Sequence, residues 1–96
     1  MEITTLLRDK RLELLRLADQ HGAHDVRLFG SCARGTPGES SDVDILVALD
    51  PGRSLLDLVA LKQDLEELLG REVHVVTRFS LSPYVRDTVI KEAVSL

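Results

Sequence analysis

Two short stretches organise this 96-residue chain: Gly30-Ser31-Cys32-Ala33-Arg34-Gly35 and Asp42-Val43-Asp44, with ten residues between Ser31 and Asp42. Glycine lets a backbone come close to a ligand, and a serine hydroxyl with neighbouring N–H groups can hold phosphate oxygens. The Arg34 side chain can add positive charge to the same phosphates. The first stretch is therefore a candidate phosphate-binding loop, although a plain turn between a strand and a short helix would look similar.

Asp42 and Asp44 lie in the second of two predicted strands, 25–29 and 42–49. Side chains two positions apart in a strand share a face, so both carboxylates are expected on one face and Val43 and Ile45 on the other. Two carboxylates this close repel each other unless they are solvated or bound to cations. Magnesium suits such a pair, because it prefers oxygen ligands and is commonly shared between carboxylates and phosphates. The alternative is that Asp42 is a turn residue and Asp44 an exposed strand residue.

The rest of the chain alternates helices with one more strand. Apolar residues at the helical period predict helices over 3–20, from Ser54 to Gly70, and from Ser82-Pro83 to the end of the chain. Ser54 with Asp57 forms a capping-box pattern, and residues 72–76 read as a strand. The order predicts an α/β or α+β fold with helices packed on a small sheet.

Composition limits the classes of protein to which the chain can belong. Ninety-six residues predict a single domain over residues 1–96, with 44% hydrophobic and 29% charged residues. The formal charge of −4 argues against nonspecific nucleic-acid binding, which needs a basic surface. A single cysteine excludes an internal disulfide and fits a reduced, cytoplasmic setting, and no apolar run is long enough for a membrane span.

Together, the two stretches resemble the signature of the minimal nucleotidyltransferases of the DNA polymerase β-like superfamily. That signature is Gly-Ser, ten residues, then Asp-x-Asp, and it is matched here by Gly30, Ser31, Asp42 and Asp44. The flanking residues 28–35 and 41–47 match as well, and the resemblance extends over nearly the whole chain.

The resemblance implies a small mixed sheet with helices, a catalytic pair Asp42 and Asp44 that binds Mg²⁺, and a nucleotide site formed by Gly30, Ser31 and Arg34. It also implies ATP as substrate and transfer of a nucleoside monophosphate to a hydroxyl. Family members this small often resemble antitoxins that are encoded beside a helical HEPN-type ribonuclease toxin, and some attach AMP to a tyrosine of that toxin.

The sequence departs from the family pattern at His74, where a third carboxylate is expected on the next strand. In the superfamily this acid helps to position the metal at the attacking hydroxyl. His74 could ligate a metal or act as a base, which a neutral imidazole can do. Glu72, two residues earlier on the same strand face, could supply the missing carboxylate. A third possibility is a weakened site in a protein that works mainly by binding.

Three functional hypotheses follow from the resemblance and from His74. The first is an antitoxin-type protein adenylyltransferase that uses ATP and Mg²⁺ to modify a HEPN toxin, with Asp42, Asp44 and His74 as catalytic residues. The second is an antitoxin that neutralises its partner by forming a complex. The third is a small-molecule nucleotidyltransferase, which would need a partner to complete its acceptor site.

Overall fold

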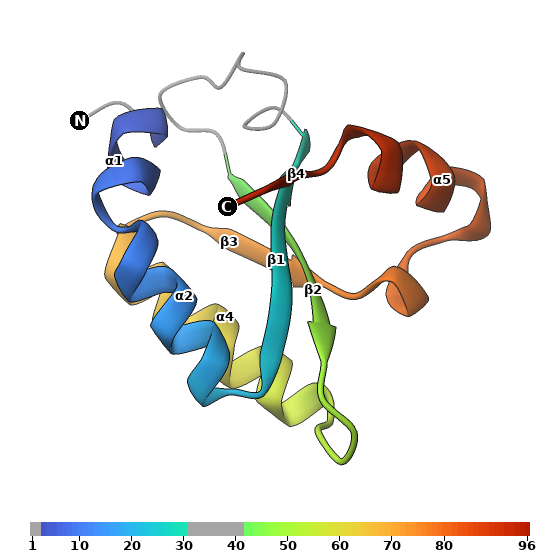
Figure 1. Cartoon of the computed structure of the whole chain (residues 1–96), viewed down its shortest axis with the longest axis horizontal. Coiled ribbons are helices and arrows are strands. Elements are labelled where there is room, and N and C mark those ends of the chain that lie inside the picture. The colour runs from blue at the N-terminus through green and yellow to red at the C-terminus, as the bar shows by residue number, and fades with distance from the viewer. Residues whose placement is uncertain (1–2, 31–41) are drawn as a thin grey trace.

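The computed structural model describes residues 3–30 and 42–96, which form a four-stranded sheet with helices packed against it (Figure 1). In chain order, the helical segments are α1 (Ile3–Asp9), α2 (Arg11–Gln20), α4 (Leu55–Leu69), the short 3₁₀ helix η1 (Arg78–Ser80) and α5 (Pro83–Glu92). The strands are β1 (Ala23–Phe29), β2 (Val43–Leu49), β3 (Val73–Val76) and β4 (Val94–Ser95).

The sheet is mixed, as the family resemblance implied. Its strand order is β3-β2-β1-β4, in which β2 runs parallel to β3 and antiparallel to β1. The parallel pair needs a crossover connection, and helix α4 supplies it. Strand β2 therefore lies inside the sheet, with a neighbour on each side.

Helices α2 and α4 cover one face of the sheet, where the apolar core forms (Figure 1). Val43 and Ile45 of β2 are fully buried against Leu14 of α2 and against Leu61 and Leu65 of α4. Burying one such aliphatic side chain stabilises the fold by roughly 1.5–3 kcal/mol. Because side chains alternate along a strand, the opposite face of β2 carries the side chains of Asp44 and its even-numbered neighbours.

Helix α4 has the ends that its sequence predicts. The Ser54 side chain accepts a hydrogen bond from the Leu56 N–H, and the Asp57 carboxylate accepts one from the Ser54 N–H at 2.9 Å. Gly70 ends the helix with φ +65°, a left-handed conformation that glycine adopts without strain. The helix that carries the chain from β2 to β3 is thus fixed at both ends by local sequence.

The prediction of one continuous helix over 3–20 was wrong. The helix is interrupted at Lys10, which has φ −99° and ψ 6° and separates α1 from α2. Lys10 falls in the apolar stripe of a continuous helix, where its ammonium group would have to be buried or extended to water. The turn leaves the Lys10 side chain 39% exposed, with Nζ 4.0 Å from Glu13 Oε1.

The prediction that the last helix continues to the C-terminus was also wrong. Helix α5 ends at Glu92, and Val94–Ser95 form strand β4 along the outer edge of β1. Val94 pairs with Leu28, and the Leu96 N–H donates to the Val26 carbonyl at 3.1 Å. This pairing gives hydrogen-bond partners to the edge of β1, and a local helical period carries no information about it.

The predicted starts of the strands were late at β1 and early at β2 and β3. Strand β1 begins at Ala23 rather than residue 25, and its register with β2 shifts between His24 and Arg27, where Asp25 has φ +52°. Strands β2 and β3 each begin one residue later than predicted.

Within residues 3–30 and 42–96, no helix has the length and apolar character needed to cross a bilayer.

Candidate functional site

The candidate site lies at the start of β2, on the sheet face opposite α2 and α4. Asp44 pairs in register with Phe29 of β1 on one side and with His74 of β3 on the other. Asp42 directly precedes the strand, and Val43 and Ile45 are both fully buried on the opposite face. The structure therefore shows the predicted alternation, with apolar side chains in the core and carboxylates on the other face.

Gly30 directly follows β1 and lies against the carboxylate of Asp44. Its φ is +72°, a left-handed conformation that other residues rarely adopt. A Cβ at this position would collide with Oδ2 of Asp44. The backbone conformation thus favours glycine here, and any other residue would have to displace the carboxylate of Asp44.

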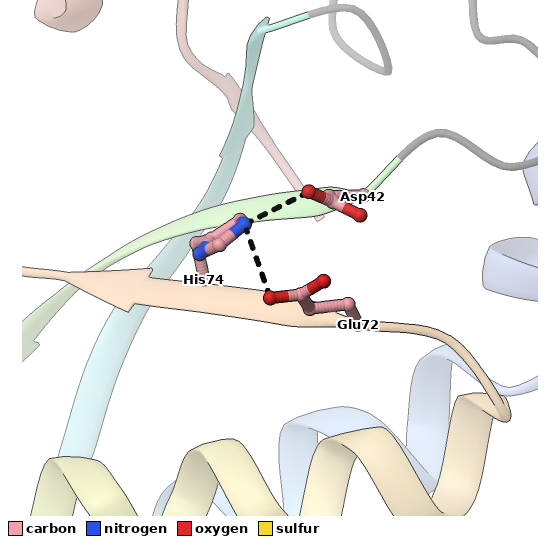
Figure 2. A group of neighbouring side chains, drawn as sticks. All are labelled: Asp42, Glu72 and His74. Carbon is pink, nitrogen blue, oxygen red and sulfur yellow. Dashed lines mark hydrogen bonds and ion pairs between the residues drawn. The ribbon is translucent and has the colours of Figure 1, made fainter.

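Three side chains converge at the starts of β2 and β3: Asp42 directly before β2, Glu72 directly before β3, and His74 within β3 (Figure 2). His74 Nε2 donates a hydrogen bond to Asp42 Oδ2 at 3.0 Å and lies 4.0 Å from Glu72 Oε1. The structure thus brings predicted residues Asp42 and His74 into direct contact. It adds Glu72, which the sequence indicated only as an alternative, through its place two residues before His74 on one strand face.

The charges around His74 favour its protonated form. The hydrogen bond to Asp42 raises the pKa of His74 above its usual value of 6.5, and the negative charges of Asp44, Asp42 and Glu72 add to this effect. Partial burial lowers the pKa of His74, by less than the hydrogen bond to Asp42 raises it. The imidazole thus offsets part of the repulsion among three neighbouring carboxylates.

Strand β3 is held in place by contacts outside the site. The Glu66 carboxylate at the end of α4 accepts hydrogen bonds from Lys62 Nζ at 2.8 Å and from the Val73 N–H at 3.1 Å. The same two bonds lower the pKa of Glu66, with the bond from Lys62 as the larger cause. The Val43 N–H donates to the Glu72 carbonyl at 3.0 Å, which aligns the starts of β2 and β3. These bonds set the positions of Glu72 and His74 relative to Asp42.

The remaining two predicted nucleotide-binding residues, Ser31 and Arg34, lie outside the described residues. Of the predicted site, the structure therefore describes Gly30, Asp42, Asp44 and His74, and it brings these four together at one end of the sheet.

A pocket of about 280 Å³ lies further along the same strand of the sheet. Leu46 and Ala48 of β2 line it, together with Arg27 of β1, Phe79 of η1 and Ile90 of α5. The Phe79 side chain is 84% exposed, and Arg78 lies over its ring at 5.8 Å from the centroid. The sequence did not predict this pocket, because its walls come from segments that meet only through the tertiary fold.

Comparison with known proteins identifies the family. A profile described as nucleotidyltransferase domain matches residues 11–96. This chain belongs to that family. The matched range includes Gly30, Asp42 and Asp44.

Curated relatives cover most of this nucleotidyltransferase. The protein adenylyltransferase MntA of Thermococcus cleftensis is 39% identical over 93 residues, which span 97% of this chain and 91% of the relative. A predicted protein adenylyltransferase of Methanocaldococcus jannaschii is 49% identical over 77 residues, covering 80% of this chain and 83% of its own length.

Solved structures show the same fold. The structure of a predicted minimal nucleotidyltransferase covers 100% of this chain and 97% of its own, with a TM-score of 0.88 and 48% identity. A chain from the crystal structure of a toxin–antitoxin with AMP-PNP has a TM-score of 0.72 and 27% identity, and the match covers 91% of this chain and 69% of that one. The nucleotidyltransferase fold expected from the resemblance is thus confirmed.

Gly30→Ala tests whether the close approach to Asp44 matters. The added methyl must displace the Asp44 carboxylate, so we expect affinity for a non-hydrolysable Mg-ATP analogue to fall at least about tenfold, measured by calorimetry. Gly70→Ala is the matched control, because it adds the same methyl at φ +65° with nothing within 4 Å. Equal affinities in the two variants would contradict a specific role for the contact.

The pKa of His74 can be measured in the metal-free protein by NMR titration of its imidazole. We expect a value above 6.5, which Asp42→Asn lowers, because the neutral amide removes the charged acceptor that contributes most to the rise. Asp50→Asn is the control, since Asp50 pairs with His24 instead. An unchanged His74 midpoint in Asp42→Asn would show that the hydrogen bond is not the cause.

Proposed function

We propose that this protein transfers AMP from ATP to a tyrosine hydroxyl on a HEPN-type toxin that it neutralises. The observation that carries the proposal is the contact of Gly30 with Asp44, with Asp42 on the same side of the sheet. The curated relatives named as protein adenylyltransferases and the toxin–antitoxin structure with AMP-PNP support the reaction and the kind of partner.

The carboxylates of Asp42 and Asp44 fit a magnesium site, because they offer oxygen ligands beside a backbone that a phosphate can approach. When bound, Mg²⁺ supplies positive charge that offsets charge on the triphosphate and on departing pyrophosphate. In the proposed role, Gly30 allows close approach of the triphosphate to Asp44, and Ser31 and Arg34 hold its oxygens. The acceptor oxygen forms a bond to the α-phosphorus, the bond to pyrophosphate breaks, and the hydroxyl proton leaves to solvent or to a base.

The contacts of His74 favour a role toward the neighbouring carboxylates over a role as base toward the acceptor hydroxyl. Its Nε2 is directed at Asp42 and Glu72, so the imidazole as placed acts on the carboxylates of the site (Figure 2). A role as base toward the acceptor would require that hydrogen bond to break. We therefore propose that His74 positions the carboxylate of Asp42, a predicted metal ligand, and does not act as the base toward the acceptor hydroxyl.

The pocket beside Phe79 suits the adenosine part of ATP. It begins at Leu46, two residues along β2 from Asp44, which corresponds to roughly 7 Å at the rise of a strand. This separation suits a base whose α-phosphate lies beside Asp44. An exposed aromatic ring such as Phe79 can stack on a purine, and such stacking contributes about 1–3 kcal/mol per base.

The transfer reaction is tested with radiolabelled ATP, Mg²⁺ and the proposed HEPN-type toxin partner. We expect label on the partner, and we expect Asp42→Ala/Asp44→Ala to lower the rate by at least about a thousandfold, because both predicted ligands are removed. Asp50→Ala is the control for loss of an exposed carboxylate after β2. Equal labelling by wild type and the double variant would refute the proposal.

The same variants distinguish AMP transfer from the alternative function, neutralisation by complex formation alone. The presence of His74 in place of the expected carboxylate favours that alternative. Under the proposal, the double variant still binds the toxin but fails to protect cells. Full protection by the double variant would favour the alternative.

Phe79→Ala tests the proposed adenosine pocket. Loss of one stacking contact is expected to weaken binding of an ATP analogue by about fivefold or more, measured by calorimetry. Leu56→Ala is the matched control, because Leu56 is 80% exposed on α4 and does not line the pocket. The affinity for inorganic triphosphate should be unchanged in both variants. If Phe79→Ala lowers the affinity for triphosphate as well, the side chain affects phosphate binding, and the proposed stacking on the base is contradicted.

A further inference from the structure

We propose that Asp42, Glu72 and His74 form a mixed carboxylate–imidazole site that binds a first-row transition-metal ion of the Zn²⁺ class more tightly than Mg²⁺. This inference rests on the proposed function, since the site shares Asp42 with the predicted magnesium site. It assigns this chain a metal preference that follows from His74 and Glu72.

The three side chains are close enough to bind one ion. One ligand atom from each lies within 4.8 Å of the others, and no other such group of three occurs among residues 3–30 and 42–96. Ligands in a tetrahedral arrangement about 2.0–2.1 Å from a Zn²⁺ ion are about 3.3–3.4 Å apart. His74 Nε2 and Asp42 Oδ2 are 3.0 Å apart, and Glu72 Oε1 is 4.0 Å from the same nitrogen. To complete the set, Nε2 of His74 gives up the proton that it donates to Asp42, and the Glu72 carboxylate moves closer to the other two ligand atoms.

The donor types favour a transition metal. Imidazole nitrogen is a common ligand for Zn²⁺ and its neighbours, whereas Mg²⁺ prefers oxygen ligands and gives up water reluctantly. Three protein ligands with nitrogen and oxygen donors are also typical of zinc sites that keep an open position. A carboxylate at position 74 would remove this preference.

The backbone around the site fixes the ligands in advance. The Val43 N–H bond to the Glu72 carbonyl aligns the two strand starts, and the Glu66 carboxylate holds the N–H of Val73, next to His74. The ligand side chains remain accessible to an ion from water, with exposures of 45% for Asp42, 61% for Glu72 and 43% for His74.

The test measures metal binding by the full chain without nucleotide or partner. Zn²⁺ and Mg²⁺ affinities are measured by calorimetry, and Co²⁺ serves as a spectroscopic substitute for Zn²⁺. We expect Zn²⁺ to bind at least tenfold more tightly than Mg²⁺, with a shift of the His74 imidazole nitrogen resonances on Zn²⁺ addition. His74→Asp should weaken Zn²⁺ and Co²⁺ binding at least tenfold while keeping Mg²⁺ binding, and Glu72→Gln should weaken Zn²⁺ binding by a smaller factor.

His24→Gln is the matched control, because His24 also pairs with one carboxylate, at 2.8 Å from Asp50, but lacks a third ligand. Circular dichroism confirms that each variant is folded. The inference is overturned if His74→Asp keeps the wild-type preference for Zn²⁺, if Zn²⁺ leaves the His74 resonances unmoved, or if His24→Gln weakens binding equally. Such a failure leaves AMP transfer to be judged by its own assay. Conversely, absent transfer with an intact His74–Zn²⁺ signature would refute the proposed function alone.

Discussion

The register of β2 between β1 and β3 is the constraint on which the rest of this structure depends. Val43 and Ile45 are fully buried on one face, and Asp42 and Asp44 lie on the other. Because side chains alternate with a period of two, a slip of one residue would put both carboxylates into the core. Burial of unpaired carboxylates is far more costly than the loss of one ladder bond. The same burial that stabilises the domain therefore determines which face carries the site.

This arrangement concentrates negative charge, which opposes folding. Asp42, Asp44 and Glu72 lie around one imidazole, and the charged form of His74 relieves part of their repulsion. Clusters of negative charge are typical of sites that bind cations, because the bound ion supplies the compensating positive charge. The hydrogen bonds that stabilise this part of the sheet, such as those that Glu66 accepts from Val73 and Lys62, lie outside the site.

The sequence predicted those features that depend on neighbouring residues. The start of α4 at Ser54, its end at Gly70 and the opposed faces of β2 follow from local chemistry, and all three are confirmed. The pairing of Val94 with Leu28 was missed, because it joins residues far apart in the chain. The pocket beside Phe79 was missed for the same reason, since β2, η1 and α5 meet there only in the folded protein.

His74 shows how a substitution can keep a site's charge while changing its chemistry. In the register, His74 lies opposite Asp44, yet its longer side chain reaches diagonally to Asp42. A carboxylate at position 74 would give three acids with Asp42 and Asp44, and Glu72 restores that number from the same strand face. In the proposed metal site, Glu72 supplies a carboxylate two residues before His74, and His74 adds a nitrogen donor. Under that proposal, the negative charge attracts the ion, and the nitrogen donor determines which metal binds more tightly.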